Sequence, residues 1–170
     1  MISPSACVST IRTGRRLINS TTVSFTQHEA PAGTEAKNEG DSNADTCCLG
    51  SNFIALEITN RTAEVYPYDP SYEPIANVPI VTGATAYDDE DGTTFILIFH
   101  ESLFYGKKLR HSLINPNQVR HHGLDFWDNP FDHRQELSIV LQDGIYIPLK
   151  YEGTRLFFKS RVPTREELST

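Results

Sequence analysis

The sequence predicts an all-β protein with a single domain. Its apolar residues occur in short runs of strand length, and turn-forming residues separate these runs. Only residues 115–123 carry the start and stop signals of a helix. A chain of 170 residues can bury one core, but it is too short for two lobes of ordinary size. We therefore expect one domain built mainly from short strands.

The first expected strands form a hairpin that leads to a projecting loop. Residues 53–58 and 62–66 have the composition of strands, and a tight turn is predicted at Asn60-Arg61. Residues 67–74 contain three prolines and two tyrosines. Because proline cannot donate a hydrogen bond within a sheet, this stretch is predicted to project as a loop or an irregular hairpin tip.

The next expected strands surround the longest apolar run of the chain. Residues 78–81 and 84–87 are predicted to be extended, and an acidic turn at residues 88–92 leads into residues 93–99. The consecutive apolar residues 95–99 predict a central strand that is buried on both faces.

The helix is expected in the second half of the chain and is followed by more strands. Asn115 suits the N-cap, Pro116 the first helical position, and Gly123 the position just beyond the end. The strands expected after the helix are residues 137–141, 145–149 and 156–158. Alternation gives one buried face to Ile145, Ile147 and Leu149.

The N-terminal quarter of the chain is expected to differ from the rest. Residues 1–39 are predicted to be a disordered leader or linker, and residues 40–170 the folded domain. The leader has no acidic residue before Glu29, which is weakly similar to an organellar transit peptide. A plain leader or a cut from a longer precursor are the alternatives. Residues 30–40 have the small and polar composition of a linker, so order is predicted to begin close to Asp41.

Composition argues against several classes of partner. The net charge of −7 and the pI near 5.3 argue against direct nucleic-acid binding, which needs clustered lysine and arginine. The longest apolar run is far shorter than the roughly 20 residues of a membrane-spanning helix, so no membrane association is expected. Three cysteines, two of them adjacent, argue against a disulfide framework and favour a reducing compartment such as the cytoplasm.

One stretch of the sequence is suited to catalysis, namely Asp41-Ser42-Asn43-Ala44-Asp45-Thr46. A carboxylate followed by a small hydroxyl, a turn residue and alanine is typical of an aspartic-protease loop. In such a site, one aspartate from each half shares a proton with its twin. The same six residues also fit a solvated acidic turn, and when read alone they favour that interpretation.

Four segments resemble the protease region of Copia-like Gag-Pol polyproteins, which belongs to the retropepsin type of aspartic protease. They are residues 41–50, 77–87, 111–120 and 161–168. Asn115-Pro116-Asn117-Gln118 and Val162-Pro163-Thr164 are the more specific matches. The resemblance extends from about residue 41 to the C-terminus. It implies a closed barrel of short strands with one short helix after an apolar-apolar loop.

The resemblance also implies roles for individual residues. Asp41 would be the catalytic carboxylate, and the Ser42 hydroxyl would grip the partner loop. The substrate-binding residues of this loop would be Asn43, Ala44 and Asp45. The loop that supports the catalytic aspartate from behind would be formed by Leu113, Ile114 and Asn115. Residues 67–73 would be the flap that closes over substrate, with residues 88–92 as the alternative. Substrate contacts from this flap would be Tyr68, Asp69 and Tyr72.

The expected function is therefore an aspartic endopeptidase that processes a retroelement polyprotein, within the cell or a retroelement particle. It acts on a polypeptide and needs no cofactor or metal. Because the sequence has one such catalytic motif, activity would require a homodimer.

One alternative is an inactive retropepsin-like domain retained as an assembly or binding module. Another is a metal or thiol site, whose cysteine and histidine pairs lack the spacing of zinc ligands. Its residues would be Cys47, Cys48, His111, His121 and His122.

Two features depart from the family pattern. Asn43 occupies a position where glycine is usual, which adds a side chain where the backbone approaches substrate. The approach to Asp41 through residues 37–40 is polar, whereas the family enters the loop from an apolar strand. The sequence therefore predicts that this strand is lost and that the catalytic loop is held less firmly.

Overall fold

The computed structural model describes residues 8–12, 28–67 and 69–169, with the backbone alone for residues 8–12. The protein is all-β, as the sequence predicts. Its described strands are β1 (Val8–Arg12), β2 (Glu35–Gly40), β3 (Cys48–Leu49), β4 (Ile54–Val65), β5 (Ile75–Asp88), β6 (Thr94–Phe104), β7 (Ser112–Ile114), β8 (Asp125–Trp127), β9 (Ser138–Val140), β10 (Tyr146–Pro148), β11 (Lys150–Glu152) and β12 (Arg155–Arg161). The described helical segments are η1 (Gly106–Lys108), α1 (Pro116–His121) and α2 (Arg165–Ser169).

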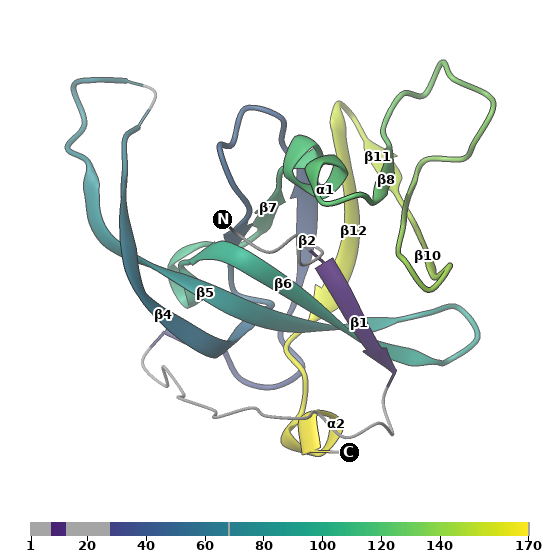
Figure 1. Cartoon of the computed structure of the whole chain (residues 1–170), viewed down its shortest axis with the longest axis horizontal. Helices are drawn as coiled ribbons and strands as arrows, with labels where there is room; N and C mark the ends of the chain where they lie inside the picture. Colours follow the sequence, from purple (N-terminus) through teal and green to yellow (C-terminus); the bar gives the residue numbers. More distant parts are fainter. Residues whose placement is uncertain (1–7, 13–27, 68, 170) are drawn as a thin grey trace.

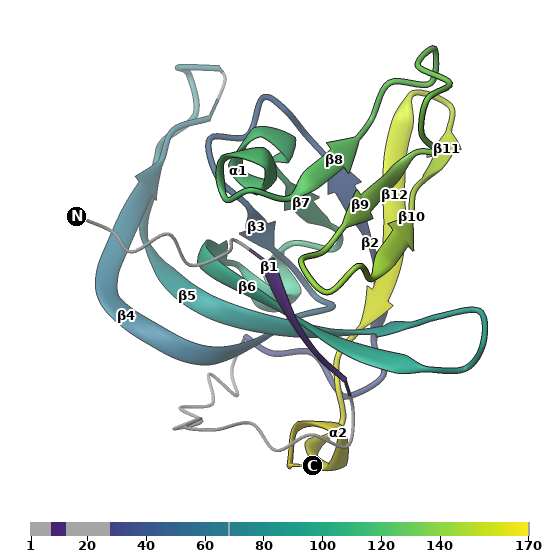
Figure 2. The ribbon, with the colours of Figure 1, turned by 45° about the vertical axis from the view of Figure 1, so that its right-hand side comes forward.

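Nine of the described strands form one sheet, with the order β1-β6-β3-β7-β2-β12-β5-β4 and β11 beside β12. β5 also pairs with β6, so the path of neighbouring strands returns almost to its beginning. A separate three-stranded sheet has the order β10-β9-β8. This small sheet lies beside β12 in both views of the ribbon (Figures 1 and 2).

β6 is the central strand of the core. Leu97 and Phe99 belong to the larger apolar cluster, whereas Ile96 and Ile98 belong to a second cluster on the opposite face of the strand. All four side chains are buried. The rings of Phe99 and Phe53 meet edge to face with their centroids 5.1 Å apart, which is a favoured aromatic geometry. The prediction of a strand buried on both faces is confirmed.

β4 and β5 form one long hairpin. The turn predicted at Asn60-Arg61 is wrong, because β4 runs continuously through both residues. The pairing of β4 with β5 is irregular at this point, which marks a β-bulge. Thr59 remains attached to the sheet, since its hydroxyl donates to the carbonyl of Ile80 at 2.8 Å. The turn-forming pair is thus accommodated as a bulge, and the proline-rich stretch forms the hairpin tip as predicted.

β2 corrects the prediction that residues 30–40 are a linker and that order begins near Asp41. The strand pairs with β12 in antiparallel and with β7 in parallel orientation. Ala36 and Asn38 are buried in it. The strand escaped prediction because Asn38 is polar and interrupts the expected apolar pattern. The predicted loss of the strand that enters the Asp41 loop is therefore wrong, and β1 lies within the supposed leader and pairs with β6.

A buried polar network joins β2 to its neighbours. The amide of Asn52 donates to Asn38 Oδ1 at 2.8 Å and to Ser160 Oγ at 2.9 Å. Asn52 Oδ1 accepts from the Ser112 hydroxyl at 2.6 Å, and the Thr85 hydroxyl donates to Ser160 Oγ at 2.6 Å. All five side chains are buried. Because each polar group has a partner, the network can replace apolar packing at this point.

Helix α1 is capped as the sequence predicts. Asn115 Oδ1 accepts hydrogen bonds from the backbone N–H groups of Asn117 and Gln118, at 2.8 and 3.2 Å. Pro116 occupies the first helical position, where its missing N–H carries no cost. The side chain of Asn115 therefore fixes where the helix begins.

α2 is a second short α-helix where the sequence predicts only one. The N–H of Glu167 donates to Thr164 Oγ1 at 3.1 Å, and the N–H of Thr164 donates to the Glu167 carboxylate at 2.8 Å. This reciprocal pair is a capping box. Arg161 donates to the carboxylates of both Glu167 and Asp88, and these hydrogen bonds hold the pKa of each carboxyl below its ordinary value.

The strands predicted near the C-terminus appear as β9, β10 and β12, and the sequence missed β8 and β11. Ile147 and Leu149 are buried, and Ile145 packs against the same cluster, so their common face is confirmed. Among the residues described, no helix is both long and apolar enough to cross a membrane.

Candidate functional site

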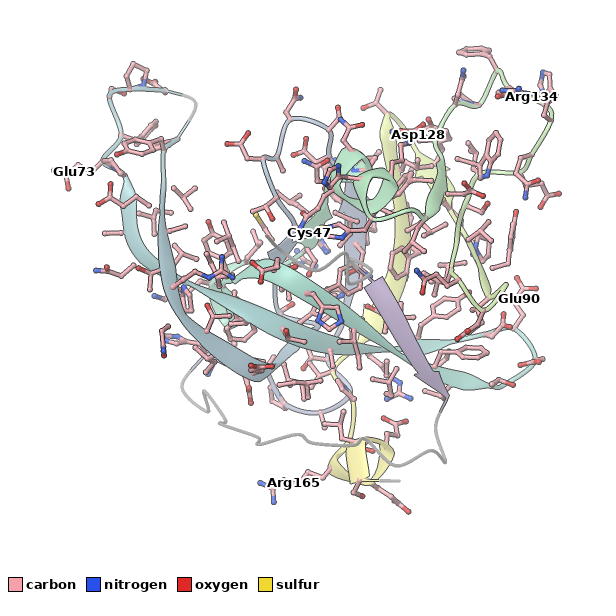
Figure 3. The ribbon with its side chains drawn as sticks, viewed as in Figure 1. Cys47, Glu73, Glu90, Asp128, Arg134 and Arg165 are labelled. Atoms are coloured by element: carbon pink, nitrogen blue, oxygen red, sulfur yellow. The ribbon has the colours of Figure 1, made fainter. Side chains whose placement is uncertain are left out.

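A groove of about 1180 Å³ lies between the hairpin of β4 and β5 and the loop that follows β2. We call this loop, residues 41–47, the Asp41 loop. Figure 1 shows it beside α1, and in Figure 3 Cys47 marks its end and Glu73 lies near the hairpin tip. The groove residues from the Asp41 loop are Asp41, Asn43, Ala44, Asp45 and Thr46. The groove residues from the hairpin are Ala63, Glu64, Val65, Tyr66, Ile75 and Ile80.

Asp41 is held at the point where β2 leaves the sheet. Its backbone N–H donates to the carbonyl of Ile114 at 2.9 Å, which continues the parallel pairing of β2 with β7. Its carboxylate Oδ1 accepts from the N–H of Asn43 at 2.9 Å. The main chain and the carboxylate of Asp41 are therefore both engaged, while the side chain still lines the groove.

Two of the three residues predicted to support Asp41 are hydrogen-bonded to its loop, namely Ile114 and Asn115. Ile114 is buried and Leu113 lines the groove. The side-chain amide of Asn115 donates to the carbonyl of Ala44 while its oxygen caps α1. One asparagine thus connects the start of the helix to the middle of the Asp41 loop.

Gln118 also contacts the Asp41 loop, and sequence reasoning missed it. Its Oε1 accepts from the N–H of Cys47 at 2.7 Å and from the Thr46 hydroxyl at 3.0 Å. The available signal was its position three residues after Asn115, which places both side chains on the same face of the helix.

The remaining residues of the predicted catalytic loop take different positions. Asn43, Ala44 and Asp45 line the groove, whereas Ser42 is exposed and lies outside the lining. Among described residues other than glycine, the left-handed backbone region is occupied by Asn77 and Glu101. Asn43 therefore does not adopt the backbone conformation that favours glycine.

The structure brings a different part of the hairpin to the groove than the sequence predicts. Tyr66 and Ile75 line the groove, and the side chains of both are largely exposed. Asp69 and Tyr72 lie in the hairpin tip, outside the lining, where the Tyr72 N–H donates to the Asp69 carbonyl. Tyr68 lies outside the described residues.

The alternative flap at residues 88–92 lies elsewhere. This turn joins β5 to β6, and none of its residues lines the groove. Figure 3 shows Glu90 and Glu73 at opposite ends of the molecule. The strand ends next to the hairpin tip border the groove, and this turn does not.

Cys48 lines the groove close to Asp41. Burial raises the pKa of its thiol to about 11 from the ordinary 9.0, and the neighbouring Cys47 and Asp41 act in the same direction. The thiolate is the nucleophilic form of cysteine. At neutral pH Cys48 is therefore a neutral and weakly reactive group.

We expect the Cys48 thiol to react slowly with iodoacetamide in the folded protein. At pH 8 its thiolate fraction is about 100-fold smaller than that of a thiol with the ordinary pKa, because the pKa lies about two units higher. Mass spectrometry of labelled peptides would give the alkylation rate, and the urea-unfolded chain is the control. Equal rates in the folded and unfolded chain would contradict this prediction.

The cysteines and histidines considered for a metal site do not form a ligand set. In the part of the chain that the structure describes, no three His, Cys, Asp or Glu side chains are placed to hold a metal ion. The rings of His121 and His122 pack edge to face, with their centroids 5.6 Å apart. Both side chains line the groove.

Comparisons with protein-family models, with curated proteins and with solved structures found no match to this chain.

Proposed function

We propose that this protein is an aspartic endopeptidase with a retropepsin-like closed barrel, active as a homodimer. The observation that carries the proposal is the placement of Asp41 in a large groove, at the start of a loop held by β7 and α1. The hairpin of β4 and β5 borders the same groove, as a covering element for substrate would.

The reaction needs two copies of Asp41. Two carboxylates held close together cannot both ionise near neutral pH, so one stays protonated. The charged carboxylate takes a proton from water while the protonated one donates a hydrogen bond to the scissile carbonyl. No covalent intermediate forms. Each chain would contribute one Asp41 on the two-fold axis.

The groove favours an extended polypeptide as substrate. Several apolar side chains line the groove, and they can pack against the apolar side chains of an extended polypeptide. They include Val65, Ile75, Ile80, Leu103 and Leu113. By the resemblance of its motifs, the polypeptide is a retroelement polyprotein, and the site of action is the cytoplasm or a particle within it.

An assay of an unstructured polypeptide at acid and neutral pH tests the proposal. Below the dissociation constant of the dimer, we expect the cleavage rate to rise with the square of the chain concentration, because each active site needs two chains. Size-exclusion chromatography over the same concentrations would measure the dimer. A rate that rises only linearly while the protein is monomeric would contradict the two-chain site. Dimerisation without cleavage would favour an inactive assembly module instead.

A further inference from the structure

We propose that Gln118 is a positioning residue that fixes the Asp41 loop within each single chain, before two chains meet. The inference rests on the proposed function, because it concerns the loop that would carry the catalytic carboxylate. It assigns the task of holding this loop to a residue outside the catalytic motif.

The side chain of Gln118 joins three segments. Its oxygen accepts from the N–H of Cys47 at 2.7 Å and from the hydroxyl of Thr46 at 3.0 Å. Its Nε2 donates to the carbonyl of Glu101 in β6 at 3.4 Å. Glutamine carries an acceptor and a donor at the same distance from its backbone. Glutamate lacks the donor and an apolar side chain lacks both, so neither can make all three hydrogen bonds.

Gln118 completes a series of attachments along the loop. The start of the loop is held by the bond from the Asp41 N–H to Ile114, and the middle by the bond from Asn115 to Ala44. Gln118 holds the end. All three attachments come from β7 and the start of α1, so one short segment controls the whole loop.

The bond to β6 reaches an unusual backbone position. Glu101 has a φ of 52°, which is uncommon for a residue with a side chain. Its carbonyl accepts from Gln118 Nε2 and lies 3.2 Å from Thr46 Oγ1, whose single proton is shared between this carbonyl and Gln118 Oε1. These bonds fix the position of the end of the Asp41 loop relative to β6, which lines the groove.

A loop held this firmly matters because catalytic groups are sensitive to small displacements. A shift of about 1 Å at a catalytic group can reduce a rate by about 100-fold. Gln118 also lines the groove. Loss of a contact with substrate alone would raise KM, whereas loss of the hold on the loop should lower kcat more than it changes KM.

The test compares three variants of the full chain. Gln118→Met keeps the length of the side chain and removes the amide, whereas Gln118→Glu keeps the oxygen that Cys47 and Thr46 use. Asn117→Ala is the matched control, because Asn117 is exposed on the same helix turn. Hydrogen-deuterium exchange of the peptide spanning residues 41–50 and steady-state cleavage kinetics are measured for each, with urea unfolding as the check on global stability.

For Gln118→Met we expect at least about 10-fold faster exchange in residues 41–50 and at least about 10-fold lower kcat, with KM within about twofold. Gln118→Glu keeps the acceptor for Cys47 and Thr46 but loses the donor to Glu101, so it should recover only part of both losses, and Asn117→Ala should match the native chain. Exchange and kcat within about twofold of native for Gln118→Met would overturn the inference. So would faster exchange throughout the chain, which would indicate general destabilisation. If the native chain does not cleave, the proposed function fails, and exchange alone decides whether Gln118 holds the loop.

Discussion

The Asp41→Asn variant is expected to lose cleavage activity by at least about 1000-fold, because it removes the carboxylates that exchange protons with water and the scissile carbonyl. The substitution preserves the shape of the side chain. Its amide oxygen can still accept the hydrogen bond from the Asn43 N–H that the carboxylate accepts at 2.9 Å. The loop should therefore keep its conformation. A lower cleavage rate in the peptide assay would then report the loss of the carboxylate and not a change in loop structure.

The matched control for this change is Asp91→Asn. Asp91 Oδ1 accepts from the N–H of Thr93 at 2.7 Å, so it makes the same kind of local bond in a turn that does not line the groove. We expect this variant to retain native activity. Cleavage that persists in Asp41→Asn would show that the activity belongs to another site or to a contaminating protease.

Mixing the two forms of the chain tests whether both carboxylates are needed. With nine parts of Asp41→Asn to one part of native chain, random pairing leaves about one tenth of the native chains in fully native dimers. The activity of each native chain should fall in that proportion. Unchanged activity would contradict a site shared between two chains.

The second large effect is expected from Asn52→Leu, which should lower the free energy of unfolding by about 2–5 kcal/mol. The leucine has the same branched shape with bulkier methyl groups, and it leaves Asn38 Oδ1 without the donor at 2.8 Å and the Ser112 hydroxyl without the acceptor at 2.6 Å. All three side chains are buried, so water cannot replace the lost bonds without cost. The midpoint of urea unfolding would measure the change.

The control for this stability change is Asn117→Leu, which makes the same substitution on the exposed face of α1. It should change the free energy of unfolding by less than about 0.5 kcal/mol. If Asn52→Leu unfolds at the same urea concentration as the native chain, the polar network does not contribute to stability and apolar packing can replace it.

The parts of the fold that the sequence predicts are those fixed by neighbouring residues. The apolar run of β6 indicates a strand buried on both faces, and Asn115 with Pro116 indicates the start of α1. β2 was missed because Asn38 is buried by partners 14 and 122 residues away along the chain. The Asn60-Arg61 pair was misread because a bulge and a turn use similar residues.

In the candidate site too, the sequence identifies residues that lie in one contiguous motif and misses those brought together by the fold. The Asp41 loop is a contiguous motif that the sequence offers as a candidate, but its residue types alone favour a solvated turn, and the resemblance of the other segments was needed to prefer a catalytic loop. Gln118 was not found, because its contact with Cys47 joins residues 71 positions apart. Tyr66 and Ile75 were missed since the register of the hairpin decides which side chains face the groove, and the sequence leaves that register open.

The bulge in β4 has a mechanical consequence for access to the groove. β5 pairs with both β4 and β6 as far as Ile80, and beyond this residue β5 pairs with β4 alone, while the ion pair of Arg61 with Glu101 still connects the hairpin to β6. The bulge lies at the same level, where Thr59 is bonded to Ile80. Two-stranded ribbons bend and twist more readily than wider sheets. We therefore expect the part of the hairpin beyond the Arg61–Glu101 contact to bend more readily than the wider sheet, which would change access to the groove.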